Sequence, residues 1–470
     1  MQKRLLYLML IVALIGNGVV AAQTLTTDVV VVGAGGAGMS AAIEAADAGA
    51  DVVLLEKMPF TGGSTMLSLG VILAAGTSVQ EKAGIVDSPD DLYEHWMSLN
   101  QFMINPGVIR RYVDEAPEAI DWLIDLGVDY SPETLYNSGV VKVLRGHRPK
   151  GDGAALAKAL NGAVKARQNI NLMLETPAID LITEDGRVIG VVAQKKDGSK
   201  FDVKAKAVVL ATGGFARNEE MMRENLPHVM EHGKEEILAN MGSTGDGIIM
   251  AQKLGADAVL TWGPGGVHSA VDPMAAPPVG AIYVNKQGVR FVDETLPYVL
   301  GYVLLAQEDG QGWVVVDSSI LGEDPWSSSH LDKEVEAGKA VKADDLWTLA
   351  EKMGINPKAL ENTVERYNAD AKEGIDSMYL KKSVKPLVQA PYYASQLLVR
   401  RVAQTAAGLF VTPRTEVLTT DGGVIEGLFA AGEITASVGP RYTGGGAAVG
   451  HAIIFGRVAG QEAAKLAMGN

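Results

Sequence analysis

The sequence predicts an α/β fold in which a Rossmann-like lobe carries an inserted α+β capping lobe. Three observations predict it. Apolar, β-branched runs alternate with alanine-rich helical stretches from residue 28 to the end of the chain. A glycine-rich turn joins the first apolar run to the first helical stretch, and similar glycine-rich signals return near the C-terminus. Between them the composition shifts to Gly and Pro around Trp262, where the helical pattern lapses.

Residues 28–56 read DVVVVGAGGAGMSAAIEAADAGADVVLLE and predict a strand, a turn, a helix and a second strand. The valines at 29–32 do not alternate with polar residues, as expected for a strand covered on both faces of a parallel sheet. Gly33, Gly35 and Gly38 then form a G-x-G-x-x-G turn. Such glycines permit a tight turn, a close approach of the backbone to pyrophosphate and close packing of helix on strand.

Glu56 closes the second strand of this unit. An acid in that place accepts hydrogen bonds from ribose hydroxyls, whereas an arginine would be expected for a 2'-phosphate. The unpaired N–H groups and the dipole of the helix N-terminus stabilise the phosphates. The stretch therefore predicts a dinucleotide site, and a plain turn is the alternative for any single glycine.

The charge and composition of the chain exclude several classes of function. Its formal net charge of −15 repels nucleic acid. Ordinary solubility explains most of this acidity, although a basic electron-donor protein could also dock on it. The absence of cysteine excludes disulfides, c-type haem attachment, thiolate-bound iron–sulfur clusters and thiol catalysis. Electrons for a redox reaction must therefore come from outside the chain.

Residues 1–22 predict a signal peptide. Lys3 and Arg4 precede an apolar run, and Val20 and Ala22 are small residues at the positions that a signal peptidase prefers. An uncleaved membrane anchor is the alternative, since the run approaches the length that spans a bilayer. We expect cleavage after Ala22, no stable membrane insertion afterwards, and a periplasmic or secreted protein.

The later segments extend the α/β pattern. A helical region at 105–127 precedes a loop and helix, and a ladder of strands follows with hairpin turns at Asp185-Gly186 and Asp197-Gly198. The predicted domains are the signal peptide (1–22), the first part of the dinucleotide lobe (23–262), the capping lobe (263–403) and the second part of the dinucleotide lobe (404–470).

Five separated motifs resemble the flavoprotein superfamily of fumarate reductase and succinate dehydrogenase. They are GAGGAG at 33–38, EKMPFTGGST at 56–65, VVLATGGFARN at 208–218, STGDGIIMA at 243–251, and LFAAGEITASVG at 428–439 with the GGGAAVGHAIIFGRVAG that follows. The resemblance covers nearly the whole chain after residue 22. It implies an FAD-dependent oxidoreductase acting on CH–CH groups, with a capping lobe over the flavin.

The resemblance also implies the residues that contact FAD. Glycine recurs because backbone must approach a long, flat, anionic cofactor. The expected cofactor-binding residues are Gly33, Gly35, Gly36, Ala37, Gly38, Glu56, Lys57, Gly62, Gly63, Ser64, Thr212, Gly213, Gly214, Asp246, Gly432, Glu433, Ala447 and Val449. Family members with covalent FAD carry an RSH-type histidine, and this chain has LSLGVIL there. We therefore expect noncovalent FAD.

The residues that handle dicarboxylates in fumarate reductases are replaced in this chain. The family's RFxNE motif reads RFVDE at 290–294, and the proton-donor position is Tyr298 in place of arginine. A substrate-binding histidine aligns with Gln404, and the charged proton path falls near Met274 and Pro277. Two carboxylates need fixed cations, because an unpaired buried anion costs several kcal/mol. Fumarate is therefore not the expected substrate.

A second, shorter resemblance concerns the catalytic residues. RFVDETLPY is similar to a segment of flavin-dependent ketosteroid dehydrogenases, and Tyr442 with Gly446 matches their Y-x-x-x-G pair. It implies that Tyr442 and the Gly446 N–H stabilise negative charge on a substrate carbonyl oxygen, and that Tyr298 protonates the α-carbon after hydride transfer from flavin N5. Packed aromatics are the alternative. A further family tyrosine has only loose candidates in Tyr112, Tyr130 and Tyr136.

The sequence thus predicts an exported FAD enzyme that reduces, or forms, a C=C bond conjugated to a carbonyl in a small unsaturated substrate. Export favours reduction with an external donor, a cytochrome or a quinol-linked protein, as in anaerobic respiration of an organic acceptor. One alternative is an enoate or fumarate-type reductase of a carboxylate, held by Arg441. Another is a flavin protein without turnover that relays electrons.

Several charged residues have simpler interpretations. His228 and His232 are spaced like metal ligands on a helix, but a solvated helix is favoured and no metal site is expected. Arg145, His147 and Arg148 could touch phosphate or substrate, or could cap a loop. His268 lies near the boundary of the lobes, and His451 follows the last glycine turn, where we expect it to pack near the flavin.

Overall fold

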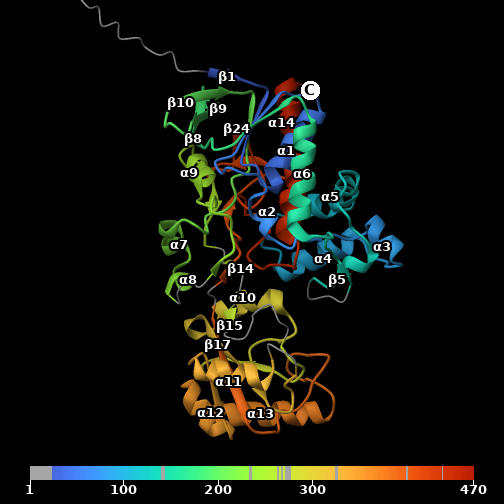
Figure 1. Ribbon diagram of the computed structural model, residues 1–470, viewed down its shortest axis with the longest axis vertical. Helices are drawn as coiled ribbons and strands as arrows, with labels where there is room; N and C mark the ends of the chain where they lie inside the picture. Colours follow the sequence, from blue (N-terminus) through green and yellow to red (C-terminus); the bar gives the residue numbers. More distant parts are fainter. Residues whose placement is uncertain are drawn as a thin grey trace, which may run out of the picture.

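The computed structural model describes residues 24–138, 143–231, 236–261, 264–265, 268–269, 277–322, 326–398, 401–436 and 438–469. Two lobes lie one above the other along the long axis of the molecule (Figure 1). The upper lobe combines the first and last parts of the chain, and the lower lobe contains the elements from β15 to β19. The predicted α/β class is confirmed. No described helix is both long and apolar enough to cross a membrane.

The upper lobe is built on a six-stranded sheet with β2 near its centre. β2 pairs in parallel with β3 and β11, as its four buried valines predict. Val29 and Val31 pack against the helical layer, whereas Val30 and Val32 face the second sheet of this lobe. The strands in sheet order are β23 (Glu416–Leu418), β24 (Val424–Ala430), β11 (Ala207–Leu210), β2 (Val29–Val32), β3 (Val52–Leu55) and β7 (Ile170–Met173).

The second sheet of the upper lobe has four strands and contains the two predicted hairpins. Asp185 and Gly186 both have positive φ, as a tight two-residue turn requires. The strands in order are β1 (Thr24–Thr26), β10 (Lys200–Lys204), β9 (Arg187–Gln194) and β8 (Ala178–Glu184). The hydrophobic core between the two sheets includes Val191 and Phe201.

Helices α1 (Gly36–Asp47) and α14 (Ala447–Met468) run side by side in the upper lobe, next to α6 (Asp152–Ala166) (Figure 1). Two glycines of α14 allow this contact. A Cβ atom at Gly456 would clash with the backbone of Ala37, and one at Gly460 would clash with that of Ala41. Because both pairs advance by four residues in the same direction, the helices are parallel.

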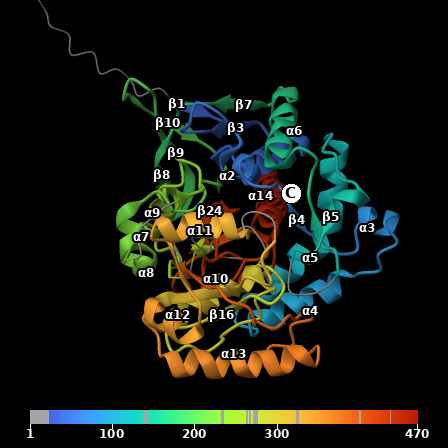
Figure 2. The same cartoon turned by 60° about the horizontal axis from the view of Figure 1, so that its bottom comes forward.

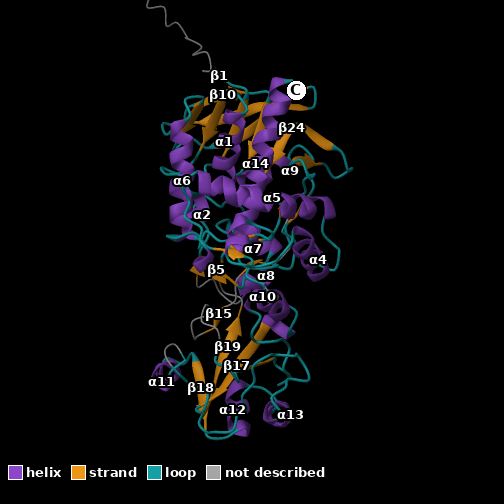
Figure 3. Ribbon diagram, turned by 90° about the vertical axis from the view of Figure 1, so that its right-hand side faces the viewer, coloured by secondary structure: helices purple, strands orange, loops and turns teal. Residues whose placement is uncertain are grey.

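The lower lobe is a five-stranded sheet with helices around it. β17, β18 and β19 lie between α11 and α13 (Figure 3), and α13 runs along the outer edge of the lobe (Figure 2). The elements are β15 (His268–Ser269), β16 (Ile282–Val284), α10 (Pro297–Leu305), η2 (Glu308–Gly310), β17 (Gln311–Asp317), α11 (Ser328–Glu336), β18 (Ala340–Ala343), α12 (Leu346–Met353), α13 (Pro357–Lys372) and β19 (Tyr392–Leu398).

Short paired segments connect the lobes. β14 (Pro264–Gly265) pairs with β21 (Gln404–Thr405), so chain entering the lower lobe lies beside chain leaving it. The predicted boundary after 262 falls on residues outside the described ones, and both predicted boundaries of the capping lobe remain predictions.

The other elements are α2 (Gly63–Leu67), β4 (Ile72–Leu73), α3 (Ser78–Lys82), α4 (Pro89–Leu99), α5 (Pro106–Asp125), η1 (Pro132–Thr134), β5 (Leu135–Tyr136), β6 (Gly146–His147), α7 (Glu219–Asn225), α8 (Pro227–Glu231), β12 (Glu236–Ile237), α9 (Asp246–Gln252), β13 (Ala258–Val259), β20 (Arg401–Val402) and β22 (Gly408–Leu409).

Candidate functional site

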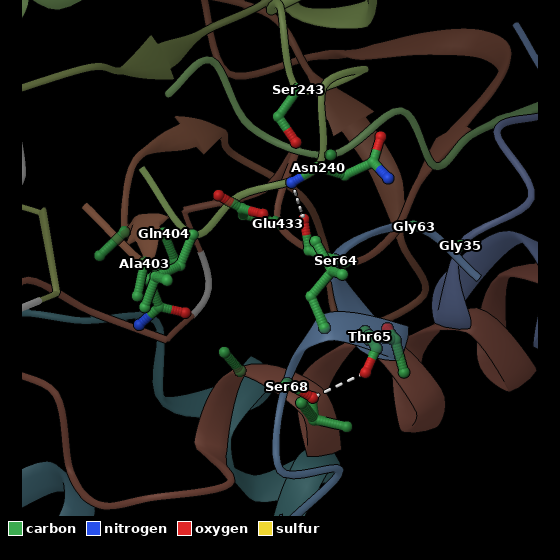
Figure 4. A pocket seen from close by; sticks show the side chains of 18 of the residues that line it. Gly35, Gly63, Ser64, Thr65, Ser68, Asn240, Ser243, Ala403, Gln404 and Glu433 are labelled. Atoms are coloured by element: carbon green, nitrogen blue, oxygen red, sulfur yellow. Dashed lines mark hydrogen bonds between the residues drawn. The ribbon is translucent and has the colours of Figure 1, made fainter. Parts of the chain in front are cut away.

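A cavity of about 780 Å³ is lined by residues of both lobes. This volume lies in the range typical of cofactor and ligand sites. Figure 4 shows Ala403 and Gln404 across it from Ser64 and Thr65. The predicted cofactor residues that line it are Gly33, Gly35, Gly36, Ala37, Glu56, Lys57, Gly63, Ser64, Thr212, Gly213, Asp246, Gly432, Glu433 and Val449.

The first glycine turn forms one wall of the cavity. Gly33 has φ +102°, and a Cβ there would clash with the carbonyl of Ala211 on the neighbouring strand. A Cβ at Gly38 would clash with the Gly33 carbonyl, so Gly38 closes the turn from behind. Gly35 faces open space, where an added Cβ would meet nothing nearer than the Gly63 Cα at 3.9 Å. The backbone at Gly35 is thus open to a ligand.

Glu56 lies at the end of β3, where the sequence predicts a ribose-binding acid. Its carboxylate accepts hydrogen bonds from the Ala34 N–H at 2.7 Å and from the Met58 N–H at 2.8 Å. The residue is 8% exposed and lines the cavity. Two backbone donors therefore hold the carboxylate beside the glycine turn.

A polar cluster extends the same wall. Lys57 Nζ pairs with Asp246 Oδ2 at 2.6 Å and contacts Thr244 Oγ1 at 2.5 Å. Ser64 Oγ accepts from the Asn240 N–H at 3.0 Å (Figure 4). The sequence motifs predict Ser64 and Asp246 as cofactor residues. Five further polar residues line the cavity that were not predicted: Thr65, Ser68, Thr176, Asn240 and Ser243. For Asn240 and Ser243, their position next to the TGDG motif in the sequence could have indicated that they line the cavity.

Two helix N-termini open onto this cavity. α1 begins after Gly35 and α14 begins after Gly446, and as glycines these two N-cap residues provide no capping side chain. Gly456 of α14 lies beside Ala37 near the start of α1, so α14 extends about 12 Å beyond the start of α1. The N-terminal N–H groups and the dipoles of the two helices favour negative charge at two separated points of one cavity.

These features fit FAD, which is long and carries a pyrophosphate at a distance from its electron-accepting ring. The open backbone at Gly35, the acid at Glu56 and the staggered helix N-termini are the features such a cofactor requires. The Thr212 hydroxyl adds a buried oxygen that lines the cavity and has no partner among the described residues.

Four predicted cofactor residues shape the cavity without lining it. Gly38 closes the glycine turn, and Gly62 precedes α2 with a left-handed φ of +114°. A Cβ at Gly214 would clash with Thr405 and with the Glu433 carboxylate. Ala447 is the fully buried first residue of α14.

Glu433 brings a carboxyl group to the cavity. Its Oε1 accepts from the Thr405 N–H at 2.9 Å and from the Thr405 hydroxyl at 3.3 Å. Burial raises the pKa of this carboxyl, and the hydrogen bonds from Thr405 oppose that effect. The neighbouring Gln404 lines the cavity at the position where the family resemblance implies a histidine (Figure 4).

Of the predicted catalytic residues, Tyr442 lines the cavity. Its hydroxyl oxygen accepts from the Ala448 N–H at 3.3 Å, in the first turn of α14. Gly446 is the N-cap of that helix with φ +101°, and its carbonyl accepts from the Leu73 N–H at 3.3 Å. Tyr298 is the second residue of α10, and its side chain lies outside what the structure describes.

The three looser tyrosine candidates are absent from the residues that line the cavity. Tyr112 is fully buried, donates to the Leu73 carbonyl at 2.9 Å and contacts Trp96 edge to face. Burial raises its pKa far above the ordinary value. Tyr130 is buried, and Tyr136 is half-buried in β5.

Arg441 and Arg290 are not among the residues that line the cavity, and both are bonded to other groups. Arg441 donates to the Leu99 carbonyl at 3.1 Å, and its guanidinium lies 5.6 Å from the ring centre of Tyr302 on α10. This contact joins the two lobes. Arg290 of the RFVDE motif forms bidentate bonds of 2.8 to 3.0 Å with Glu294 and Asp376.

The RFVDE motif therefore has a structural part in the lower lobe. Lys381 Nζ lies 2.9 Å from Glu294 Oε2, so two buried cations, Arg290 and Lys381, balance two buried acids, Glu294 and Asp376. A fully paired network of this kind fixes the chain that leads into α10. The start of α10 is where the sequence predicts the proton donor.

The lower-lobe part of the cavity is lined mainly by apolar and aromatic side chains. Leu300, Tyr302 and Leu305 contribute from α10, and Trp326 lies before α11. Burial raises the pKa of the Tyr302 hydroxyl, and the charge of Arg441 opposes this. No sequence motif marks these residues.

The remaining candidates do not reach the cavity. Arg145 is buried against Asp87 in an ion pair of 2.6 Å, and the ring of His147 bonds the Thr77 hydroxyl at 2.7 Å. Both have the loop-fixing role given above as an alternative. Arg148 pairs with Asp152 at 2.7 Å.

Of the remaining histidines, the side chain is described for His451 but not for His228 or His268. His451 is buried in α14 against Phe455, is absent from the residues that line the cavity, and has its pKa lowered by burial to about 3. His268 begins β15. The His228 side chain and residues His232 and Met274 lie outside the described residues. The described residues contain no group of three metal-ligating side chains.

Comparisons with known proteins agree with this geometry. The profile of a family described as FAD binding domain matches residues 28–449. Fumarate reductase (cytochrome) of Shewanella frigidimarina is 35% identical over 460 residues, covering 95% of this chain and 78% of the relative. Urocanate reductase of Eggerthella lenta is 33% identical over 475 residues, covering 95% and 76%.

A solved structure is also similar over the whole chain. It is 3-ketosteroid-Δ4-(5α)-dehydrogenase from Rhodococcus jostii RHA1 in complex with 4-androstene-3,17-dione. The TM-score is 0.82 at 31% sequence identity, and the match covers 96% of this chain and 99% of the other.

Proposed function

This chain belongs to the fumarate reductase and succinate dehydrogenase flavoprotein superfamily, and we propose that it reduces a C=C bond conjugated to a carbonyl in an uncharged substrate. It is an FAD-dependent oxidoreductase of a family that acts on CH–CH groups. The observation that carries the proposal is the Tyr442 hydroxyl in the cavity at the N-terminus of α14.

Tyr442 is suited to hold the carbonyl oxygen of such a substrate. Its oxygen accepts the Ala448 N–H, and a phenol that accepts a hydrogen bond becomes a stronger donor. The positive end of α14 also favours negative charge at this point. A carbonyl oxygen bonded there would be stabilised as charge moves onto it. We assign the same task to the Gly446 N–H and assign protonation of the α-carbon to Tyr298.

Among the residues that the structure describes, the engagement of three cations of or near the lower lobe supports an uncharged substrate. Arg441 bonds Leu99 and contacts Tyr302, and Arg290 and Lys381 are balanced by Glu294 and Asp376. A carboxylate without a cation would lose several kcal/mol on leaving water. A neutral carbonyl needs only hydrogen-bond donors, which Tyr442 supplies.

FAD supplies the hydride when it is bound in its reduced form. We assign its pyrophosphate to the N-terminus of α1, its ribose to Glu56, and its ring to the end of the cavity near α14. The segment at 66–73 has no histidine, which supports noncovalent binding. Acid precipitation of the purified protein should then leave all the flavin in the supernatant.

We further propose that the protein is exported and takes electrons from an external protein, a cytochrome or a quinol-linked donor. The charged start, apolar run and small exit residues of 1–22 support export. The lack of cysteine supports an external donor, because this chain attaches no c-type haem. Reduction is then the physiological direction.

A carboxylate substrate is the second candidate, because two relatives are named fumarate reductase and urocanate reductase. The test is to reduce the bound flavin without oxygen and follow its reoxidation by cyclohexenone, fumarate, urocanate and cinnamate. Our proposal predicts fast reoxidation by the enone. Reoxidation by the carboxylates alone would favour the second candidate, and failure of every acceptor would favour an electron relay.

A further inference from the structure

The cavity continues from the predicted carbonyl site into the lower lobe. There its lining includes Leu300 and Leu305 of α10, Val314 of β17 and Leu397 of β19. All four side chains are apolar. A ligand that reaches this part of the cavity must therefore present an apolar body to these walls.

One polar group in this apolar region has no partner. Trp326 lines the cavity and is 8% exposed, and its indole N–H makes no hydrogen bond to the described residues. Two other tryptophans have partners: Trp96 Nε1 donates to the Val438 carbonyl at 3.2 Å, and Trp347 Nε1 donates to Glu351 at 3.2 Å. A buried donor left unpaired is unfavourable and requires an explanation.

A second unpaired group lies on the same sheet face. Ser395 is 2% exposed, and its hydroxyl has no partner among the described residues. It lies directly opposite Val314, which in turn lies opposite Tyr283. Residues opposite one another in antiparallel strands point to the same face. Val314 and Tyr283 both line the cavity, so Ser395 lies on the sheet face that bounds it, although Ser395 is not itself among the lining residues.

We infer that the lower lobe contains a distal subsite in which Trp326 donates a hydrogen bond to an acceptor at the far end of the substrate. The substrate class is then a ring-bearing or elongated α,β-unsaturated carbonyl compound with an apolar body and a distal ketone, ether or hydroxyl oxygen. The inference rests on the proposed function and names its substrate class.

The test uses two fused bicyclic enones with the FAD-loaded enzyme. One carries a second ketone on the distal ring, and the other has a methylene in its place. Trp326→Phe removes the N–H and keeps an aromatic side chain. Trp347→Phe, on the exposed face of α12, is the matched control. Calorimetric Kd values of the oxidised enzyme and steady-state kcat and KM are measured for both compounds.

Trp326→Phe should weaken binding of the diketone about 10-fold, with little change for the compound that has the methylene. The change should appear in KM, while kcat stays near that of the parent. Equal effects on both compounds, or no binding of either, would overturn the subsite. Selective loss of diketone binding without turnover of either compound would keep the subsite and reject the proposed enone reduction.

Discussion

The upper and lower parts of the cavity recognise their ligands by different means. The upper part presents backbone at Gly33 and Gly35, two helix N-termini and the acid Glu56. The lower part presents side chains, among them Tyr302 and Trp326. Backbone recognition suits a cofactor that a whole family shares, because glycine motifs preserve it. Side-chain recognition suits a substrate that differs from one relative to the next.

The largest effect is expected from Tyr298→Phe, at the point where the two parts meet. Loss of a general acid lowers kcat by roughly 10²- to 10⁴-fold, while the FAD content should stay unchanged. The measurement is steady-state turnover of cyclohexenone together with the flavin absorbance of the purified protein. Tyr93→Phe on α4, where the ring contacts Arg110, is the control. Unchanged turnover would remove Tyr298 from the mechanism.

The stability of the upper lobe should also depend on a buried neutral histidine, His147. His147 lies in β6, which pairs with β4, and β4 contacts Gly446 at the start of α14. Burial lowers the His147 pKa to about 4, against about 6.5 in the unfolded chain. The folded form therefore binds the proton more weakly, and the stability that neutral His147 provides above pH 6.5 is lost as the pH falls toward 4.

Once the pH is below both pKa values, the free energy of unfolding has fallen by about 3 kcal/mol. His147→Gln should make the free energy of unfolding less dependent on pH between about 6.5 and 4. The measurement is urea unfolding at a series of pH values. His330→Gln, on the partly exposed α11, is the control and should keep the slope of the parent. An unchanged slope in His147→Gln would contradict the account.

Gly35→Val tests backbone recognition in the upper part alone. The Gly35 φ of −78° is open to any residue, and there is room for a Cβ, so the fold should persist. The added methyl groups would enter the space that we assign to FAD, and we expect the affinity for FAD to fall roughly 100-fold. Fluorescence titration of the apoprotein measures it. Gly162→Val, where a Cβ also meets nothing within 4 Å, is the control. Equal FAD affinity in both variants would contradict the assignment.

Arg441→Met should have the smallest effect, because Arg441 joins the two parts and does not bind the substrate in this account. Losing the contact with Tyr302 should lower kcat/KM for an enone by about 2- to 5-fold. Arg187→Met, at an exposed ion pair with Glu426, is the control. A loss of more than 100-fold, confined to a carboxylate substrate, would instead favour the enoate reductase.

The upper part was more predictable from sequence than the lower part. The valine strand, the glycine turn and Glu56 follow one another in the chain, so the sequence predicts their positions together. The hairpins at Asp185 and Asp197 were also found by their turn residues. In the lower part, Tyr302, Trp326 and Leu397 come from separate elements that meet only after folding. No local pattern marks such a wall.

The central claim is that a phenol, Tyr442, stabilises the carbonyl oxygen of an uncharged substrate. The most direct test is stopped-flow reoxidation of the reduced flavin by cyclohexenone in Tyr442→Phe. The account predicts a rate roughly 10²- to 10³-fold below that of the parent, while reoxidation by ferricyanide stays unchanged. An enone rate equal to that of the parent would contradict it.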